Sequence, residues 1–228
     1  MRKTAGFAGA AAAALVLLGA GGASASSGPQ PDWGGNNHHH RDAGRTFVAH
    51  LQPLNAGEHT VAEKTYTIPS TQGTAVVRVK GDDVSVTIKV RGVTAETLHP
   101  QHIHAGEKCP NASDDKNRDG FVDVIEGLPK YGPILVSLDS ELDSFAPSLD
   151  FPVADAKGRY RYHEHASKSH LQAELKEALK LGTRHVVIHG INPDARVNPL
   201  PASVASLPGL PAWATLPVAC GELDRAHH

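Results

Sequence analysis

The stretch GDDVSVTIKV, residues 81–90, alternates apolar and polar side chains without a break after an Asp-containing turn. In an extended chain, residues two positions apart point to the same face. One face of this strand would therefore carry only apolar side chains, namely Val84, Val86, Ile88 and Val90. Gly81-Asp82-Asp83 is typical of the turn that joins such a strand to its neighbour. The stretch predicts a strand of an antiparallel sheet with one buried face.

Short apolar runs separated by turn residues recur on both sides of this strand. They predict further strands at residues 46–51, 61–68, 74–80, 101–105, 134–138, 159–163, 185–189 and 218–222. One helix is predicted between Ser169 and Gly182, because Leu171, Leu175 and Leu179 share one helical face. Many short strands with frequent turns are typical of a β-sandwich or barrel. The sequence thus predicts an all-β domain with one short helix over residues 46–225.

The first 45 residues differ in character from this domain. Arg2 and Lys3 precede an apolar, alanine-rich run, and Ala23-Ser24-Ala25 offers the small residues of a cleavage site. This order is typical of a secretory signal peptide, which we predict over residues 1–25. Residues 26–45 are rich in Gly, Pro, Asn and His without periodicity, which is typical of a disordered leader. We therefore expect a secreted, extracellular protein without a membrane span.

Charge and cysteine content limit the kinds of partner and the redox state that we expect for this protein. The formal net charge is −2, and the sequence has no basic stripe of the kind that binds nucleic acid. The two cysteines are Cys109 and Cys220. In an oxidising compartment a single disulfide between them is the expected state, with two unpaired thiols as the alternative. No spacing in the sequence points to a particular protein partner.

The segment DKNRDGFVDVIE, residues 115–126, matches the twelve-residue calcium-binding loop at every defined position. Calcium takes about six to eight oxygen ligands, and a curled loop aims alternate residues at one centre. Gly120 would make the sharp turn, and the ligands would come from Asp115, Asn117, Asp119, the carbonyl group of Phe121, Asp123 and Glu126. A solvated Asp/Asn/Gly turn is the alternative. Because Gly127-Leu128-Pro129 follows at once, we expect no flanking helices and a structural ion rather than a calcium sensor.

Two of the predicted strands carry histidines on one face. His102 and His104 flank the apolar Ile103, and the strand at residues 185–189 begins and ends with a histidine. With the apolar residues facing the core, the imidazoles would meet on the outer face of neighbouring strands. A pocket rich in nitrogen ligands suits copper or zinc. The alternative is a set of surface or hydrogen-bonded histidines without a metal.

The same motifs resemble those of the Cu,Zn superoxide dismutases. Residues 84–109, with His102 and His104, are similar to the copper-strand region of that family, and residues 184–189 are similar to the strand that carries its remaining copper histidine. Ala219-Cys220-Gly221 is similar to its terminal disulfide strand, with Cys109 as the partner. The resemblance implies a Greek-key β-sandwich with His102, His104 and His189 as copper ligands.

A second resemblance covers part of the same region. The phrase HPQHIHAG, residues 99–106, and the run from residue 47 to 106 resemble CHRD domains, modules named after chordin. Together the two resemblances touch most of residues 46–224. They imply a secreted β-sandwich that binds metal.

The sequence also departs from the dismutases. The calcium-type loop stands where those enzymes have a zinc loop, and Pro217 stands three residues before Cys220, where they keep an arginine that guides superoxide. No zinc site is implied, and a fourth nitrogen for copper has three candidates that spacing does not separate: His99, His163 and His165. Three hypotheses remain: a metal-binding protein with structural calcium and bound copper, a copper-only superoxide dismutase, and an extracellular interaction module whose histidines bind no metal.

Overall fold

The computed structural model describes residues 44–142, 148–167, 180–191 and 200–226. The signal peptide predicted over residues 1–25 and almost all of the predicted leader lie outside the described residues. The predicted helix around Leu171, Leu175 and Leu179 also lies outside them, and Gly182 belongs to a single 3₁₀ turn, η2 (Leu181–Thr183). Within the described part of the chain, no helix combines the length and apolar character that a membrane crossing requires.

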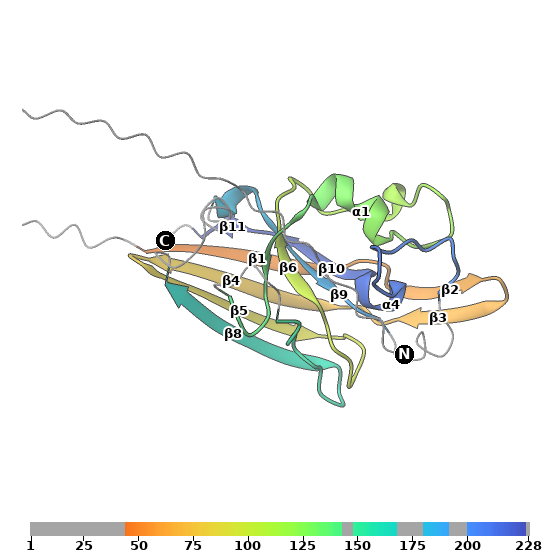
Figure 1. Ribbon diagram of the computed structural model, residues 1–228, viewed down its shortest axis with the longest axis horizontal. Helices are drawn as coiled ribbons and strands as arrows, with labels where there is room; N and C mark the ends of the chain where they lie inside the picture. Colours follow the sequence, from red (N-terminus) through yellow and green to blue (C-terminus); the bar gives the residue numbers. More distant parts are fainter. Residues whose placement is uncertain (1–43, 143–147, 168–179, 192–199, 227–228) are drawn as a thin grey trace, which may run out of the picture. The chain divides into compact units, whose positions relative to one another are not determined.

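Nine strands form one antiparallel sheet (Figure 1). Their order is β7-β6-β9-β10-β1-β4-β5-β8, with β11 paired to β1. The strands are β1 (Arg45–Pro53), β4 (Gln72–Lys80), β5 (Asp83–Arg91), β6 (Gln101–His104), β7 (Ile134–Ser137), β8 (Arg159–Ser167), β9 (His185–His189), β10 (Pro217–Glu222) and β11 (Asp224–Arg225). The prediction of an all-β fold is confirmed.

One predicted strand is wrong in its extent. Residues 61–68 do not form a single strand, because Ala62 and Glu63 adopt positive φ angles of 49° and 66° and reverse the chain. The result is a separate two-stranded hairpin of β2 (Gly57–Val61) and β3 (Lys64–Ile68).

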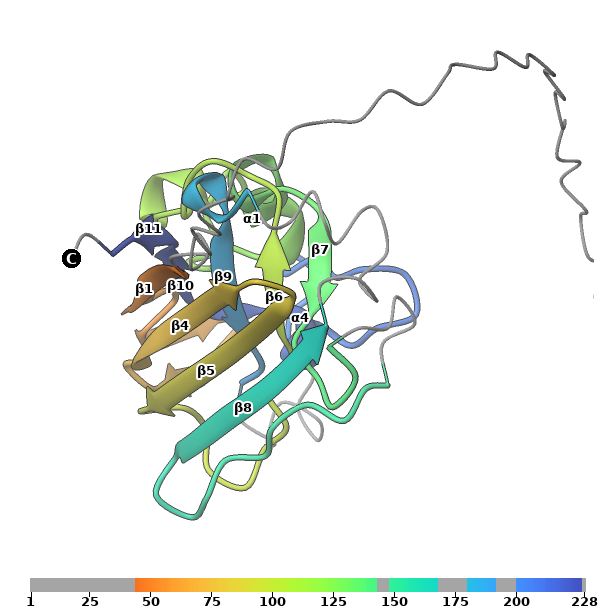
Figure 2. The same ribbon diagram turned by 90° about the vertical axis from the view of Figure 1, so that its left-hand side faces the viewer.

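The sheet curls at β1, which belongs to both of its halves. Residues 45–51 pair with β4, whereas Gln52 and Pro53 pair with β10. The two halves, β1-β4-β5-β8 and β10-β9-β6-β7, are distinguished in Figure 2. Hydroxyl groups on β8 link them at the far end, since Tyr160 donates to Oε1 of Gln101 at 3.0 Å and Tyr162 donates to the carbonyl oxygen of Asp139 at 2.9 Å. A Greek-key arrangement of two stacked sheets stays a prediction.

The alternation of residues 84–90 sets the interior of this curled sheet. Val84, Val86, Ile88 and Val90 are all buried in one core cluster, which also contains Ile103 of β6 and Val186 and Ile188 of β9. The apolar faces of both halves therefore supply one core, as the sequence predicts.

Replacing Ile88 by alanine should lower the free energy of unfolding by about 2–5 kcal/mol, because the side chain is completely buried and its loss leaves a cavity. Lys89→Ala is the matched control, since Lys89 is the exposed neighbour on the opposite face and should change stability by less than about 0.5 kcal/mol. Urea unfolding followed by circular dichroism measures both. Equal losses would contradict the assigned faces of β5.

Helical elements lie in the connection between β6 and β7, contrary to expectation. A 3₁₀ turn, η1 (Ala112–Asp114), precedes the acidic loop, and α1 (Val124–Tyr131) begins inside it. Asp123 caps α1 by accepting from the N–H groups of Ile125 and Glu126, and Glu126 accepts in return from the N–H of Asp123. The prediction that no helix flanks the loop is therefore wrong.

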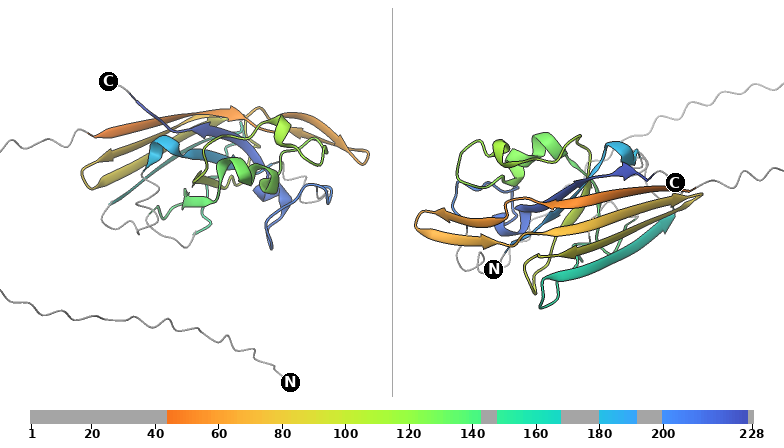
Figure 3. Two further views of the ribbon diagram at one scale, coloured as in Figure 1. Left: turned by 90° about the horizontal axis from the view of Figure 1, so that it is seen from above. Right: turned by 180° about the vertical axis from the view of Figure 1, so that it is seen from behind.

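The connection covers one half of the sheet. Figures 1 and 3 show α1 over the β6-β9-β10 half, on the side away from β4, β5 and β8. One further short helix, α4 (Ala212–Thr215), directly precedes β10.

Candidate metal centre

His102, His104 and His189 come together on neighbouring strands. β6 pairs with β9 in a register that places His104 opposite His185 and His102 opposite Val187. The ring centroids of His102 lie 5.6 Å from His104 and 5.4 Å from His189, and those of His104 and His189 are 5.9 Å apart. One ligand nitrogen from each ring lies within 4.8 Å of the other two. The three rings are thus placed to hold a metal ion.

Hydrogen bonds fix the tautomer of two of these histidines. Nδ1 of His104 contacts the carbonyl oxygen of Gly132 at 2.8 Å, and Nδ1 of His189 contacts that of Thr215 at 2.7 Å. A carbonyl oxygen only accepts, so each Nδ1 carries the proton and each Nε2 of the neutral ring has a free lone pair. Carbonyl groups that accept the proton of the other ring nitrogen orient metal-binding histidines in this way.

One nitrogen of each ring in the cluster has no hydrogen-bond partner. Nδ1 of His102 and Nε2 of His104 and of His189 are buried without a hydrogen bond. A buried polar atom left unpaired is costly, by about 1–3 kcal/mol, so three of them pointing to one place need an explanation. A metal ion bound to these nitrogens would supply it.

Burial also keeps the three rings neutral. Desolvation lowers the pKa of His102 well below its usual value, and the neighbouring His189 and His104 lower it further. Desolvation is the main cause that lowers the pKa of His104 to about 3 and that of His189 to about 4. Protons therefore do not compete for these nitrogens at neutral pH, as a metal site requires.

The metal-free protein should become less stable as the pH falls below 6.5. Unfolded histidines have a pKa near 6.5, whereas folded His104 and His189 have pKa values of about 3 and about 4. Between these values the unfolded chain binds more protons, so this stability is complete above pH 6.5 and is lost as the pH falls through 4 towards 3. Urea unfolding at pH 7 and pH 5 measures the loss. A His104→Gln/His189→Gln variant should show a smaller pH-dependent loss, and an equal one would contradict the buried, neutral assignment.

The outer face that carries the cluster is covered rather than open. The ring centroid of Tyr131, at the end of α1, lies 4.7 Å from that of His104 and 6.4 Å from that of His189. Phe151 contacts His102 edge-on at 5.4 Å. His104 and His189 are only 2% and 4% exposed, whereas His102 is half-buried. His102 is therefore the most exposed ring of the three.

None of the candidates for a fourth nitrogen joins the cluster. Both ring nitrogens of the fully buried His99 contact carbonyl oxygens, those of His189 and Thr94. His163 and His165 are exposed on β8, where His163 bonds to the hydroxyl of Thr87. The described residues thus supply three nitrogens, and a metal here would keep a position open.

The disulfide between Cys109 and Cys220 is confirmed, with a Cα–Cα distance of 5.7 Å. The bridge packs with Tyr131 and with Val187, which lies between the two histidines of β9. The disulfide therefore also holds Tyr131, the last residue of α1, against the strand face that carries the candidate metal centre.

The acidic loop is curled, as its pattern predicts. Gly120 has a φ of 92°, which favours glycine. Both carboxylate oxygens of Asp115 accept backbone N–H groups, from Arg118 at 2.7 Å and Gly120 at 2.9 Å. Glu126 reaches back across the loop to the N–H groups of Lys116 at 2.7 Å and Asn117 at 3.1 Å. Asp115 and Glu126, the first and last predicted ligands, thus lie where the two ends of the loop meet.

The carboxylates of the loop do not converge as the histidines do. Among the described residues, only the histidine cluster brings three His, Cys, Asp or Glu ligand atoms within 4.8 Å of one another. Asp119 accepts from the N–H of Phe121, and both oxygens of Asp123 accept N–H groups, including that of Ala205 at 2.7 Å. Phe121 is buried in the core and stacks on His59. Calcium in this loop stays a prediction.

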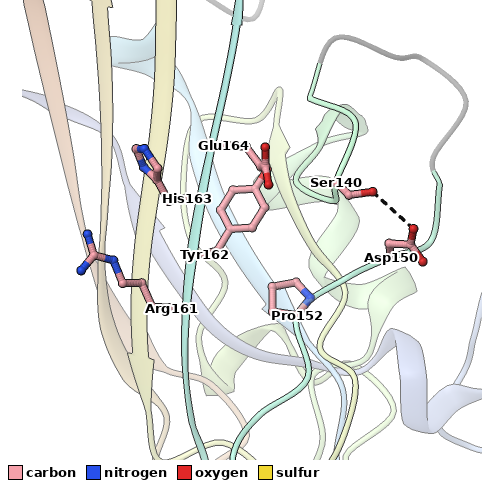
Figure 4. A pocket seen from close by; sticks show the side chains of 7 residues that line it. All are labelled: Ser140, Asp150, Pro152, Arg161, Tyr162, His163 and Glu164. Carbon is pink, nitrogen blue, oxygen red and sulfur yellow. Dashed lines mark hydrogen bonds between the residues drawn. The ribbon is translucent and has the colours of Figure 1, made fainter.

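A pocket lies along β8 (Figure 4), and it is not lined by His102, His104 or His189. Its lining is Ser140, Asp150, Pro152, Arg161, Tyr162, His163 and Glu164. The close-up shows one hydrogen bond among these side chains, between Ser140 and Asp150. The pocket gathers no set of metal ligands or reactive groups that indicates chemistry.

The helix that covers the histidine cluster was missed in the sequence. Tyr131 and the carbonyl groups of Gly132 and Thr215 were not among the predicted site residues, and backbone acceptors leave no mark on a sequence. Asp123, which caps α1, was the one available signal.

No protein-family model matches this chain, and a search of curated proteins found no significant match.

Proposed function

We propose that this chain is a secreted metal-binding protein of the superoxide dismutase-like or CHRD type, with one copper ion held by His102, His104 and His189. The observation that carries the proposal is the meeting of three histidine rings within reach of one ion, each with a buried nitrogen that has no hydrogen-bond partner. Binding of a cation would satisfy all three atoms at once, and no side chain would need to move far to reach it.

The ligand set supports copper over the other common metals. Imidazole suits copper and zinc, and copper(II) binds most tightly in the usual affinity order of divalent metals. Structural zinc sites are closed by four protein ligands, whereas three are gathered here, so among zinc sites only the catalytic type with an open position matches this set. The resemblance of residues 84–109 to the copper strands of the dismutases favours the same metal.

Calcium is the second ion of the proposal, bound in the loop at residues 115–126. The support is the full motif together with the curl that Asp115, Gly120 and Glu126 give it. Because Asp123 caps α1, calcium would stabilise both the loop and the helix that follows. Its role would be structural.

Copper loading tests the proposal directly. The protein is purified without a histidine tag, loaded with copper and passed over a desalting column before elemental analysis. We expect about one equivalent of copper, with nitrogen hyperfine structure in the electron paramagnetic resonance spectrum. A loaded protein without tightly bound copper or zinc would refute the proposal and leave an extracellular interaction module.

A superoxide assay on the loaded protein separates binding from catalysis. A set of three ligands, which leaves a coordination position free, favours the alternative of a copper-only superoxide dismutase, because turnover needs such a position. The missing arginine favours binding, since electrostatic steering would be weaker. We expect the rate to fall far below the diffusion limit, and a rate near that limit would favour the dismutase.

Calcium should raise the thermal unfolding temperature of the wild-type protein and have a much smaller effect on Asp115→Asn. The asparagine keeps one oxygen for the N–H bonds of the loop but removes the charge that calcium needs. Asp83→Asn is the matched control, because it removes an exposed acid at the start of β5. Scanning calorimetry with and without calcium measures the increment. Equal increments in all three proteins would refute the calcium site.

A further inference from the structure

We infer that calcium binding to the loop at residues 115–126 raises the affinity of the histidine cluster for its transition metal, with α1 as the connecting element. The inference rests on the proposed function, because it concerns the regulation of that same metal centre. It follows from contacts at the two ends of one short helix.

The first end of α1 is part of the loop. The side chain of Asp123 caps the helix by accepting from the N–H groups of Ile125 and Glu126. The carboxylate of Glu126 accepts from the N–H groups of Lys116 and Asn117 on the other side of the loop. Both residues are predicted calcium ligands. Anything that fixes the carboxylate of Glu126 therefore fixes the start of α1.

The second end of α1 is part of the metal centre. Tyr131 is its last residue, and the ring contacts both His104 and His189. The next residue, Gly132, provides the carbonyl oxygen that holds the proton of His104 on Nδ1 and so leaves Nε2 free for a metal. A shift of this end would disturb the orientation and the tautomer of a ligand.

Internal contacts make α1 transmit such a shift as a unit. The hydroxyl of Tyr131 donates to the carbonyl oxygen of Val124 at 3.0 Å and so ties the last residue of the helix to the first. The ring lies so close to Gly127 that a Cβ there would come within 2.4 Å of it. The backbone after the last residue of the helix packs equally closely on Gly106, since a Cβ on Gly106 would come within 2.6 Å of the N of Gly132.

The sign of the coupling follows from what each ion needs. A helix of eight residues is not stable by itself, so the position of α1 depends on the anchors at its ends. Calcium and the transition metal both favour the same placement of α1, and two ligands that favour one state favour each other's binding. Direct repulsion between the two cations has the opposite sign. A tighter transition-metal site in calcium therefore distinguishes the helix route from simple charge effects.

Isothermal titration calorimetry of zinc, a probe without redox chemistry, tests the inference. The buffers are passed over a chelating resin, so that no soluble chelator competes for zinc, and calcium or magnesium is then added back. The His102→Ala/His104→Ala variant gives the background from other histidines. We expect zinc to bind on the order of tenfold more tightly in calcium than in its absence, with little effect of magnesium.

Two variants locate the effect. Asp115→Asn should bind zinc equally with and without calcium. Tyr131→Phe keeps the ring but loses the hydrogen bond to Val124. It should still bind both ions, but calcium should raise its zinc affinity by a smaller factor, the coupling factor, than in the wild-type protein. An unchanged factor in Tyr131→Phe would overturn the route through α1.

The failures of the two proposals are distinguishable. Equal or weaker zinc binding in calcium, in a protein that binds calcium by direct titration, would overturn the inference and leave the proposed metal centre intact. Absence of saturable zinc binding above background would refute the metal centre and the inference together. Absence of calcium binding would refute the calcium loop and the inference but not the histidine site.

Discussion

The double variant His102→Ala/His104→Ala should lose tight binding of copper and zinc altogether. It removes two of the three nitrogens that meet within 4.8 Å, and His189 alone is an ordinary single ligand. Loss of residues that merely orient metal ligands costs about 10- to 100-fold in affinity, so loss of two ligands should cost more than about a hundredfold. Equilibrium dialysis followed by elemental analysis measures the change, and circular dichroism checks that the variant is folded.

The chain contains a matched control for this experiment. His163 and His165 have the same spacing as His102 and His104, and they also lie on one face of a strand. They are exposed on β8, however, and they bring no third ligand with them among the described residues. His163→Ala/His165→Ala should therefore keep full copper binding. Loss of copper from this control and not from the first variant would show that the metal lies elsewhere.

Removal of the disulfide should produce the second large effect. Cys109 and Cys220 are 111 residues apart in sequence, and cross-links that close such long loops stabilise a protein by up to about 4.7 kcal/mol in the chain-entropy model. The measured loss for native disulfides is typically about 2–5 kcal/mol. We expect Cys109→Ser/Cys220→Ser to unfold at a temperature lower by on the order of 10 °C in scanning calorimetry.

The bridge should also affect the metal centre, because it packs against Tyr131 and Val187. The serine variant should therefore bind copper more weakly than the wild-type protein, even at temperatures where it is fully folded. Wild-type protein treated with a metal-free reducing agent should behave like the variant. Unchanged stability after complete reduction would contradict a stabilising role for this bond.

Local patterns predicted most of the fold. Strict alternation placed Val84, Val86, Ile88 and Val90 in the core, and the same rule placed His102 and His104 opposite Ile103. The turn at Ala62 and Glu63 escaped prediction, because neither residue type normally adopts positive φ and no glycine marks the position. Strand order was beyond reach, since pairing partners depend on contacts between distant segments.

The candidate site was predicted in its ligands but not in its surroundings. Alternation placed His102 and His104 on one face of their strand and both His185 and His189 on one face of theirs, and the resemblance to the dismutases selected His189. The helix α1 was missed because Gly127 and Pro129 lower helix propensity, and the packing of Tyr131 on Gly127 is a tertiary contact that outweighs this preference. The exclusion of His99 as a ligand also required coordinates, because only the fold shows that both of its nitrogens face carbonyl oxygens.

The position of β10 between β9 and β1 has a consequence for biosynthesis. Ribosomes deliver β1, β4 and β5 early, but within the ladder of paired strands β6 and β9 join them only through β10, which is made more than 150 residues after β1. Such a distant pairing is slow to form, because a long loop must close first. A nascent chain can form the early pairs of β1, β4 and β5 before β6 and β9, which carry the histidines, are joined to them. We therefore expect metal binding to follow the completion of synthesis, because the two strands that carry the histidines are joined to the rest of the sheet last.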